Sequence, residues 1–342
     1  MTGKHAAPSR RLVPLRPQVR PARPGDPEKP GRQARSGAPG RATSNGSGPE
    51  SSGIDRPLTR RRPFLARHDV PPMAAAGLVL IGALAVFCFA GPLFYHPDLA
   101  HVNLLQGNRP PGPGHPLGTD GNGVDILGLL MAGGRLSLEV GAAAGLLAAM
   151  IGSAWGAVAG YVGGPAGAMM MRIVDAAIAI PTLVLLLLLS AIYTPSPAAL
   201  VLLIAATSWL STAYLVRGAA LSLRSRDFVQ AVRVMGGGRI RAISRHIAPN
   251  ALGIVTVNVT FQVADAILAL ATLSYLGLGV QPPASDWGDM IAGGIRYIYD
   301  GYWWEIYPAG LAIILAVVAF NLLGDGLRDA FDPARPKPRL KR

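Results

Sequence analysis

The sequence predicts an all-α membrane protein with about six transmembrane helices, preceded by a disordered N-terminal tail. Half of the 342 residues are hydrophobic and only 15% are charged, a composition typical of a chain that lies in lipid. Apolar segments long enough to cross about 30 Å of hydrocarbon recur along the chain. The basic residues lie in blocks between and outside these segments. Together these three observations define the fold class.

Six apolar segments are expected to span the membrane and to form one transmembrane domain over residues 73–330. Prolines at positions 181, 195 and 197 interrupt or bound the third and fourth segments. Proline is tolerated inside a membrane helix where neighbouring helices satisfy the freed carbonyl group. The expected spans lie near residues 73–95, 137–161, 168–192, 198–216, 251–275 and 306–326.

The placement of Lys and Arg predicts the orientation, because basic residues are retained on the cytoplasmic side. Of the 32 Lys and Arg, the external segments would hold only Arg109, Arg135 and Arg296. Both termini are therefore expected in the cytoplasm, with the chain as a multi-pass protein of the cell membrane. The net charge of +13 follows from this topology and from anionic lipids, so it needs no nucleic-acid partner.

The two ends of the chain have compositions that cannot form a packed core. Residues 1–72 are rich in Pro, Gly, Arg and Ser and have no apolar period, so they are expected to be a disordered cytoplasmic tail. Arg60, Arg61, Arg62 and Arg67 lie directly before the first apolar segment, where they would attract anionic lipid. Residues 331–342 are expected to form a basic cytoplasmic tail.

A basic, polar loop over residues 217–250 interrupts the membrane pattern. Its segment QAVRVMGGGRIRAISRHIAP, from Gln230 to Pro249, contains a helical run up to Met235 and three glycines that cannot extend a helix without cost. An amphipathic run with isoleucines at three- and four-residue spacing follows and ends near Pro249. Such a helix presents a surface to a partner. The alternative is that its arginines only contact lipid headgroups.

This loop resembles the EAA loop of ABC importer permeases, with Gln230 at the first position, Gly236 at the glycine and Pro249 at the proline. Three further stretches resemble the second permease subunit of dipeptide and oligopeptide ABC importers, in the binding-protein-dependent transport family. The resemblance implies a type I ABC importer permease fold. The stretches are HPLGTDGNGVD (115–125), LSYLGLGVQPPASDWGDM (273–290) and PAGLAIILAVVAFNLLGDGLRDAFDP (308–333).

The resemblance also implies the partners. A similar permease chain would complete a heterodimer, two ATP-binding domains or subunits would supply the energy, and an extracytoplasmic peptide-binding protein would deliver the substrate. The chain has no GxxxxGK[ST] phosphate loop, so we expect a non-catalytic subunit that binds no cofactor, with ATP and Mg on its partners. The residues implied to contact the ATPase are Gln230, Ala231, Gly236, Gly237, Arg239, Ile240, Ile243, His246 and Pro249.

Ionisable groups inside membrane spans are expensive and point to function. Asp265 lies near the middle of the fifth span, without the nearby cation that Arg135 offers to Glu139 and Arg172 offers to Asp175. We therefore expect Asp265 to face the translocation path. In the DWG turn, Asp286 and Trp287 are candidates for the substrate mouth. No metal site is expected, because one histidine among turn residues, His115, rarely makes one.

The chain departs from the family pattern in ways that leave the substrate open. The family commonly has a glutamate where Leu270 stands and arginines at the positions of Val124 and Leu129. At about 100° per residue, Asp265 lies on a different helix face from Leu270. Permeases for nickel or glutathione are similar at these motifs. An ion-coupled secondary carrier is a further alternative, whereas no HExxH or GxSxG motif supports an intramembrane enzyme.

Overall fold

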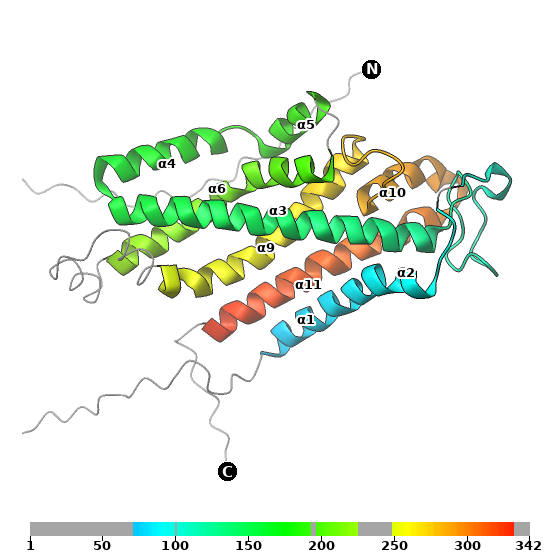
Figure 1. The fold of residues 1–342 in the computed structure, drawn as a ribbon, viewed down its shortest axis with the longest axis horizontal. Helices are drawn as coiled ribbons and strands as arrows, with labels where there is room; N and C mark the ends of the chain where they lie inside the picture. Colours follow the sequence, from blue (N-terminus) through cyan, green and yellow to red (C-terminus); the bar gives the residue numbers. More distant parts are fainter. Residues whose placement is uncertain (1–70, 100, 193–195, 225–247, 332–342) are drawn as a thin grey trace, which may run out of the picture. The chain divides into compact units, whose positions relative to one another are not determined.

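The computed structural model describes residues 71–99, 101–192, 196–224 and 248–331. These residues form helices, turns and two isolated bridges, Gly112–His115 and Thr119–Asp125. The expected tails and most of the polar loop fall outside them. The main helices, labelled in Figure 1, are α1 (Pro72–Ala85), α2 (Gly91–Phe94), α3 (Ile126–Val162), α4 (Gly164–Ile178), α5 (Thr182–Ile192), α6 (Pro197–Arg224), α9 (Ala248–Tyr275), α10 (Trp287–Gly294) and α11 (Tyr307–Phe331).

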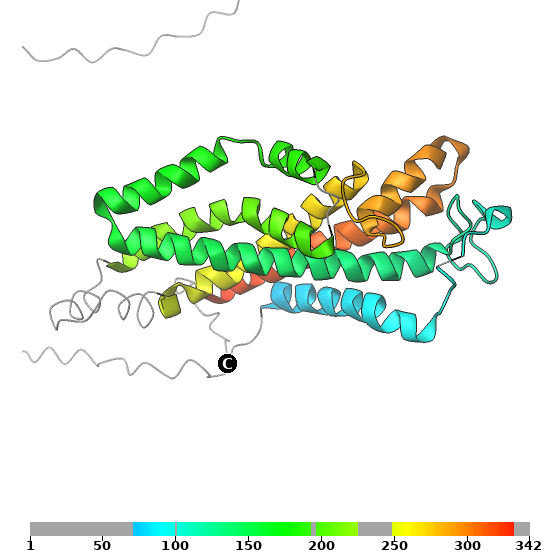
Figure 2. The ribbon, with the colours of Figure 1, turned by 45° about the horizontal axis from the view of Figure 1, so that its top comes forward.

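The expectation of about six spans is confirmed. Among the described residues, five helical segments are long and apolar enough to cross a membrane, and a sixth span arises if α4 and α5 are counted together. The first of the five is continuous from α1 through a π-helical turn, Val86–Ala90, into α2. Helices α4 and α5 are bent by 73° at their break, and Figure 2 shows them as two pieces joined by a short linker. Pro181 ends this linker, where its ring and missing N–H disfavour a continuous helix.

Two helices extend beyond the spans expected from the sequence. Helix α3 begins at Ile126 and not near residue 137, because Asp125 caps it by accepting a hydrogen bond from the Gly128 amide at 2.8 Å. Helix α6 continues to Arg224, so the start of the expected loop 217–250 is helical. Arginines near the end of a span can extend to the lipid headgroups, and the helix therefore need not end where the charges begin.

Close packing of α3 against α6 depends on a stripe of small residues. A Cβ atom added to Gly152 would lie 2.5 Å from the Trp209 carbonyl oxygen, and one added to Gly156 would lie 2.4 Å from that of Ala213. Gly160 continues the same spacing of four. Small residues at this spacing let two membrane helices approach through their backbones.

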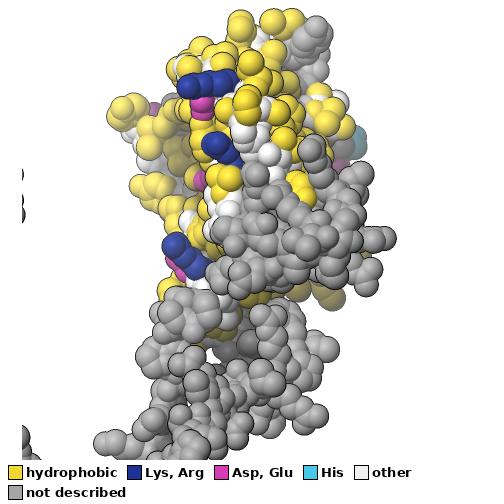
Figure 3. Space-filling view, turned by 90° about the vertical axis from the view of Figure 1, so that its left-hand side faces the viewer, with side chains coloured by type: hydrophobic (Ala, Val, Ile, Leu, Met, Phe, Trp, Pro, Cys, Tyr) yellow, Lys and Arg dark blue, Asp and Glu magenta, His cyan; other side chains and the backbone are white. Residues whose placement is uncertain are grey.

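The same helix α3 also packs against α9, and α11 packs against α1 and α9. Buried side chains between these helices include Cys88, Ile126, Ile267 and Trp287, all with at most 1% of their surface exposed. Large apolar side chains such as Val79 and Leu93 are exposed on the outside, as expected for helices that face lipid. Figure 3 shows hydrophobic side chains over much of one face of the described residues, with a few charged groups among them.

Candidate functional site

A polar seam joins α6 and α9 inside the predicted membrane region. The side-chain amide of Gln262 donates to the Ser208 carbonyl oxygen and to Thr212 Oγ1, both at 2.7 Å. Thr212 in turn donates to Asn258 Oδ1 at 2.6 Å. Gln262 and Thr212 are almost completely buried. Because these buried polar groups are hydrogen-bonded to one another, the seam holds the two helices together at little cost in desolvation.

Asp265 follows Gln262 on the same side of α9 and opens onto a pocket of about 370 Å³. In contrast to its buried neighbours, Asp265 is exposed. Within the part of the chain that the structure describes, its carboxylate has no hydrogen-bond or ion-pair partner. Four of the other residues that line the pocket are Thr182, Thr207, Ser208 and Ser211.

Two other carboxylates on membrane-spanning helices differ from Asp265, because each has a nearby cation. Glu139 accepts a hydrogen bond from Arg135 Nε at 2.9 Å. Asp175 lies 3.5 Å from Arg172 Nη1 and also accepts a hydrogen bond from the Tyr214 hydroxyl. The sequence spacing predicted both ion pairs.

Leu270 is fully buried in a hydrophobic cluster with Leu186 and Ile204, whereas Asp265 is exposed. The two positions therefore lie on different faces of α9, as the helix geometry predicted. The pocket beside Asp265 also touches Ile178 and Thr182, which flank the break between α4 and α5. An irregular backbone at membrane depth is tolerated only where protein buries it or a polar cavity receives it.

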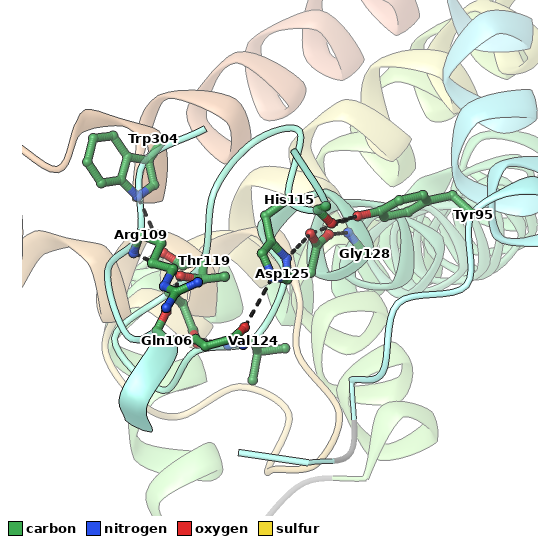
Figure 4. A network of polar contacts seen from close by, with 11 residues as sticks. Tyr95, Gln106, Arg109, His115, Thr119, Val124, Asp125, Gly128 and Trp304 are labelled. Carbon is green, nitrogen blue, oxygen red and sulfur yellow. Dashed lines mark hydrogen bonds and ion pairs between the residues drawn. The ribbon is translucent and has the colours of Figure 1, made fainter. Parts of the chain in front are cut away.

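The segment before α3 is ordered by a buried aspartate (Figure 4). Asp125 is 2% exposed and accepts hydrogen bonds from the Tyr95 hydroxyl and from His115 Nδ1, each at 2.9 Å, in addition to its helix cap. Burial of the Tyr95 hydroxyl, its hydrogen bond to Asp125 and the negative charge of Asp125 together raise the pKa of Tyr95 to about 12. His115 Nε2 lies 3.2 Å from Gln106 Oε1. His115 therefore serves the loop structure.

A second set of contacts joins this loop to the segment before α11. The Trp304 indole donates to the Thr119 carbonyl oxygen at 3.3 Å, and the Thr119 hydroxyl donates to the Gln106 carbonyl oxygen at 2.5 Å. Asp120 closes the turn by accepting from the Val124 amide at 2.7 Å. Burial raises the pKa of Asp120 above its ordinary value, although the backbone hydrogen bonds act in the opposite direction. The loop is thus fixed against the segment before α11 at this end of the helices.

The interpretation of Asp286 and Trp287 as a substrate mouth does not fit their burial, because both side chains are 0% exposed. Asp286 is the N-cap of α10: it accepts from the amides of Gly288 and Asp289 at 2.7 and 3.1 Å, and from the Ser274 hydroxyl. Burial raises the pKa of Asp286 despite these hydrogen bonds. The Trp287 indole donates to the Leu130 carbonyl oxygen at 3.0 Å. Both residues hold α10 against the rest of the fold.

Comparison with known proteins identifies the family. Residues 152–336, more than half of the chain, match the model of the binding-protein-dependent transport system inner membrane component. The chain belongs to this family.

Two relatives are similar to this chain over most of its length. The oligopeptide transport system permease protein OppC of Bacillus subtilis is 37% identical over 261 residues, which are 76% of this chain and 85% of that protein. The dipeptide transport system permease protein DppC of the same organism is 35% identical over 285 residues, which are 83% of this chain and 89% of that protein. The chain is therefore a multi-pass membrane component of a transport system.

Most of the coupling residues expected in this inner membrane component lie outside the described residues. They are Gln230, Ala231, Gly236, Gly237, Arg239, Ile240, Ile243 and His246. Pro249 is the second residue of α9, where proline is compatible with the first helical turn. The family match spans this region, but no contact of the loop follows from it.

The sequence reasoning found Asp265 and missed the seam beside it. Asn258, Gln262 and Asp265 recur at four- and three-residue spacing in an otherwise apolar segment. This spacing places all three on one side of a helix. The spacing of these three polar residues therefore indicates a polar face on α9.

Proposed function

We propose that this chain is one permease subunit of an ATP-driven importer of short peptides. The observation that supports this proposal most directly is the similarity to OppC and DppC over at least three quarters of the chain. Both relatives are named as permeases of peptide transport systems. A second, similar permease subunit would form the other half of the path, and an extracytoplasmic peptide-binding protein would deliver the substrate.

The translocation path in this proposal runs beside α9 at the pocket of Asp265. The exposed carboxylate, the polar seam at Gln262 and the break between α4 and α5 support this position. All three are polar features at membrane depth, which are retained where a path or site requires them. Asp286 and Trp287 have no role in the path in this proposal, because both are buried.

Energy would come from two ATPase domains or subunits that bind ATP and Mg. The contact is proposed to be the loop from Gln230 to Pro249, whose glycines and amphipathic run suit a short helix in a groove of the partner. The chain has no phosphate-binding GxxxxGK[ST] motif of its own. Both termini are proposed to lie in the cytoplasm, with the arginines before α1 at anionic lipids.

The broken α4–α5 span and the unpaired Asp265 also favour a second candidate, an ion-coupled secondary carrier. Carriers often bind their ions beside discontinuous helices at mid-membrane. Within the first candidate, nickel and glutathione remain alternatives to peptides as the substrate. One transport assay separates these possibilities.

The assay uses the complex purified through this chain and reconstituted in vesicles with its binding protein. We expect uptake of radiolabelled trialanine that requires ATP on the ATPase side and persists when ionophores abolish the ion gradients. Trialanine uptake without ATP that stops with ionophores would favour the carrier. ATP-dependent uptake of Ni²⁺ or glutathione without uptake of trialanine would replace the peptide substrate.

A further inference from the structure

We propose that Asp265 binds a primary ammonium group of the transported solute and thereby makes the path selective for that charge. The inference rests on the proposed function and specifies the chemistry of its substrate. An ammonium group reaches such a site either as the amino terminus of a peptide or as a lysine side chain. Both sources present the same donor groups and the same charge.

The first argument is the missing counter-charge. Glu139 and Asp175, on α3 and α4, each lie near an arginine, whereas no described residue pairs with the carboxylate of Asp265. A carboxylate away from bulk water is unfavourable unless a cation joins it or it takes up a proton. Its exposure to the pocket leaves room for a cation from outside the chain.

The second argument is the hydrogen-bonding character of the pocket wall. The Thr207 hydroxyl donates to the Ile204 carbonyl oxygen at 3.0 Å, and Gln262 Nε2 donates at 2.7 Å both to the Ser208 carbonyl oxygen and to Thr212 Oγ1. The donors of these side chains are thus used within the protein, so their oxygens remain as acceptors. The pocket is otherwise lined mainly by apolar side chains, and two free acceptor oxygens beside a carboxylate suit an ammonium group, which only donates.

The same wall disfavours a carboxylate. The residues that line the pocket include no Lys or Arg, and a substrate carboxylate placed beside Asp265 would meet a like charge. Two carboxylates at short range repel each other. The pocket therefore discriminates between the two ends of a peptide as well as between solutes.

The third argument is size. A volume of about 370 Å³ lies near the lower end of the range of roughly 300–1,000 Å³ for ligand pockets. It accommodates one peptide terminus or one side chain. Because α5 forms one wall and is joined to α4 only through the break, recognition of the ammonium group takes place where the two half-helices meet.

The test compares three probe peptides in the reconstituted complex. Ala-Ala-Ala carries only the terminal ammonium group, N-acetyl-Ala-Lys-Ala carries only the side-chain ammonium group, and N-acetyl-Ala-Ala-Ala carries neither. Uptake by the Asp265→Asn complex is divided by wild-type uptake of the same peptide, which cancels the preference of the binding protein. Glu139→Gln is the matched control, because it neutralises a carboxylate that already has an arginine partner. Asp265→Glu tests whether the charge alone restores uptake.

We expect Asp265→Asn to lower uptake of one or both ammonium-bearing peptides about tenfold, which corresponds to the loss of about 1.4 kcal/mol of binding free energy. Uptake of N-acetyl-Ala-Ala-Ala should stay within about twofold, and Glu139→Gln should leave all three ratios near one. The peptide that responds identifies the source of the ammonium group.

Equal loss for all three peptides, no loss for any, or failure of the Asp265→Asn complex to assemble would overturn the inference, the last by making Asp265 a subunit contact. If the wild-type complex takes up no peptide in an ATP-dependent way, the proposed function fails and the inference fails with it. An intact wild-type uptake with unchanged ratios rejects the inference alone.

Discussion

The close approach of α3 and α6 predicts that one chemical change, Gly to Ala, has opposite effects at two positions. At Gly156 on α3, the new Cβ atom would lie 2.4 Å from the Ala213 carbonyl oxygen, and ordinary contact begins near 3.4 Å. The two helices would have to separate by about 1 Å, which forfeits a quarter to a half of the dispersion energy of each contact along the interface. At Gly218 on α6, a Cβ atom would meet nothing within 4 Å.

Gly156→Ala should therefore cost about 1–3 kcal/mol through overpacking, offset by about 1 kcal/mol of helix propensity. Gly218→Ala should gain up to about 1 kcal/mol of helix propensity. The two variants should differ by about 2 kcal/mol, or by roughly 3 °C in Tm for a protein of this size. The assay is thermal unfolding of the purified protein in detergent, followed by tryptophan fluorescence. Trp155 and Trp209, with ring centroids 5.4 Å apart, report on this interface. A Gly156→Ala protein as stable as Gly218→Ala would refute the reasoning.

Three further predictions concern the seam, the N-cap and the loop. Gln262→Leu leaves Thr212 and the Ser208 carbonyl oxygen without their amide donor and should lower the free energy of unfolding by about 1–3 kcal/mol. Denaturation in SDS measures this change. An unchanged midpoint would show that the seam does not contribute to stability. Burial raises the folded pKa of Asp286 above its ordinary value of 3.8, so ionisation of this carboxyl is harder in the folded state. The stability of the wild type should therefore fall relative to that of Asp286→Asn as the pH rises from about 4 through the folded pKa. Parallel Tm curves of the two proteins from pH 4 to pH 8 would contradict this. Replacing the glycines at 236–238 by alanines should reduce peptide uptake per ATP hydrolysed in the reconstituted complex, whereas normal coupling would reduce the loop to a lipid contact.

Much of the fold follows from properties that are local in the sequence. Span number follows from apolar length, and the pairs Arg135–Glu139 and Arg172–Asp175 follow from helical spacing. The start of α3 is not local in this sense, because Gly133 and Gly134 lie inside the helix although glycine lowers helix propensity. In the structure they lie against Asp286 and Trp287, residues far away in the sequence. Long-range packing therefore decides whether a glycine pair ends a helix or allows two segments to touch.

In the candidate site, too, some features follow from the local sequence and others from long-range packing. Asp265 could be identified because a charge inside an apolar segment is conspicuous, and helix geometry separated it from Leu270. The role of Asp286 could not be read in this way, since an aspartate before Trp-Gly is equally compatible with an exposed turn. Asp286 accepts a hydrogen bond from Ser274 at the end of α9, and the amide of the next residue, Trp287, donates to the Ser137 hydroxyl of α3 at 3.3 Å. Those contacts exist only in the assembled fold.

The measurement that tests the central claim most directly is affinity purification of this chain from its native membrane, with mass-spectrometric identification of the proteins that accompany it. The account predicts a second permease of similar topology, one or two ATPases and a peptide-type binding protein in the same complex. Recovery of the chain alone or as a homo-oligomer, with transport that ignores ATP and follows an ion gradient, would contradict it.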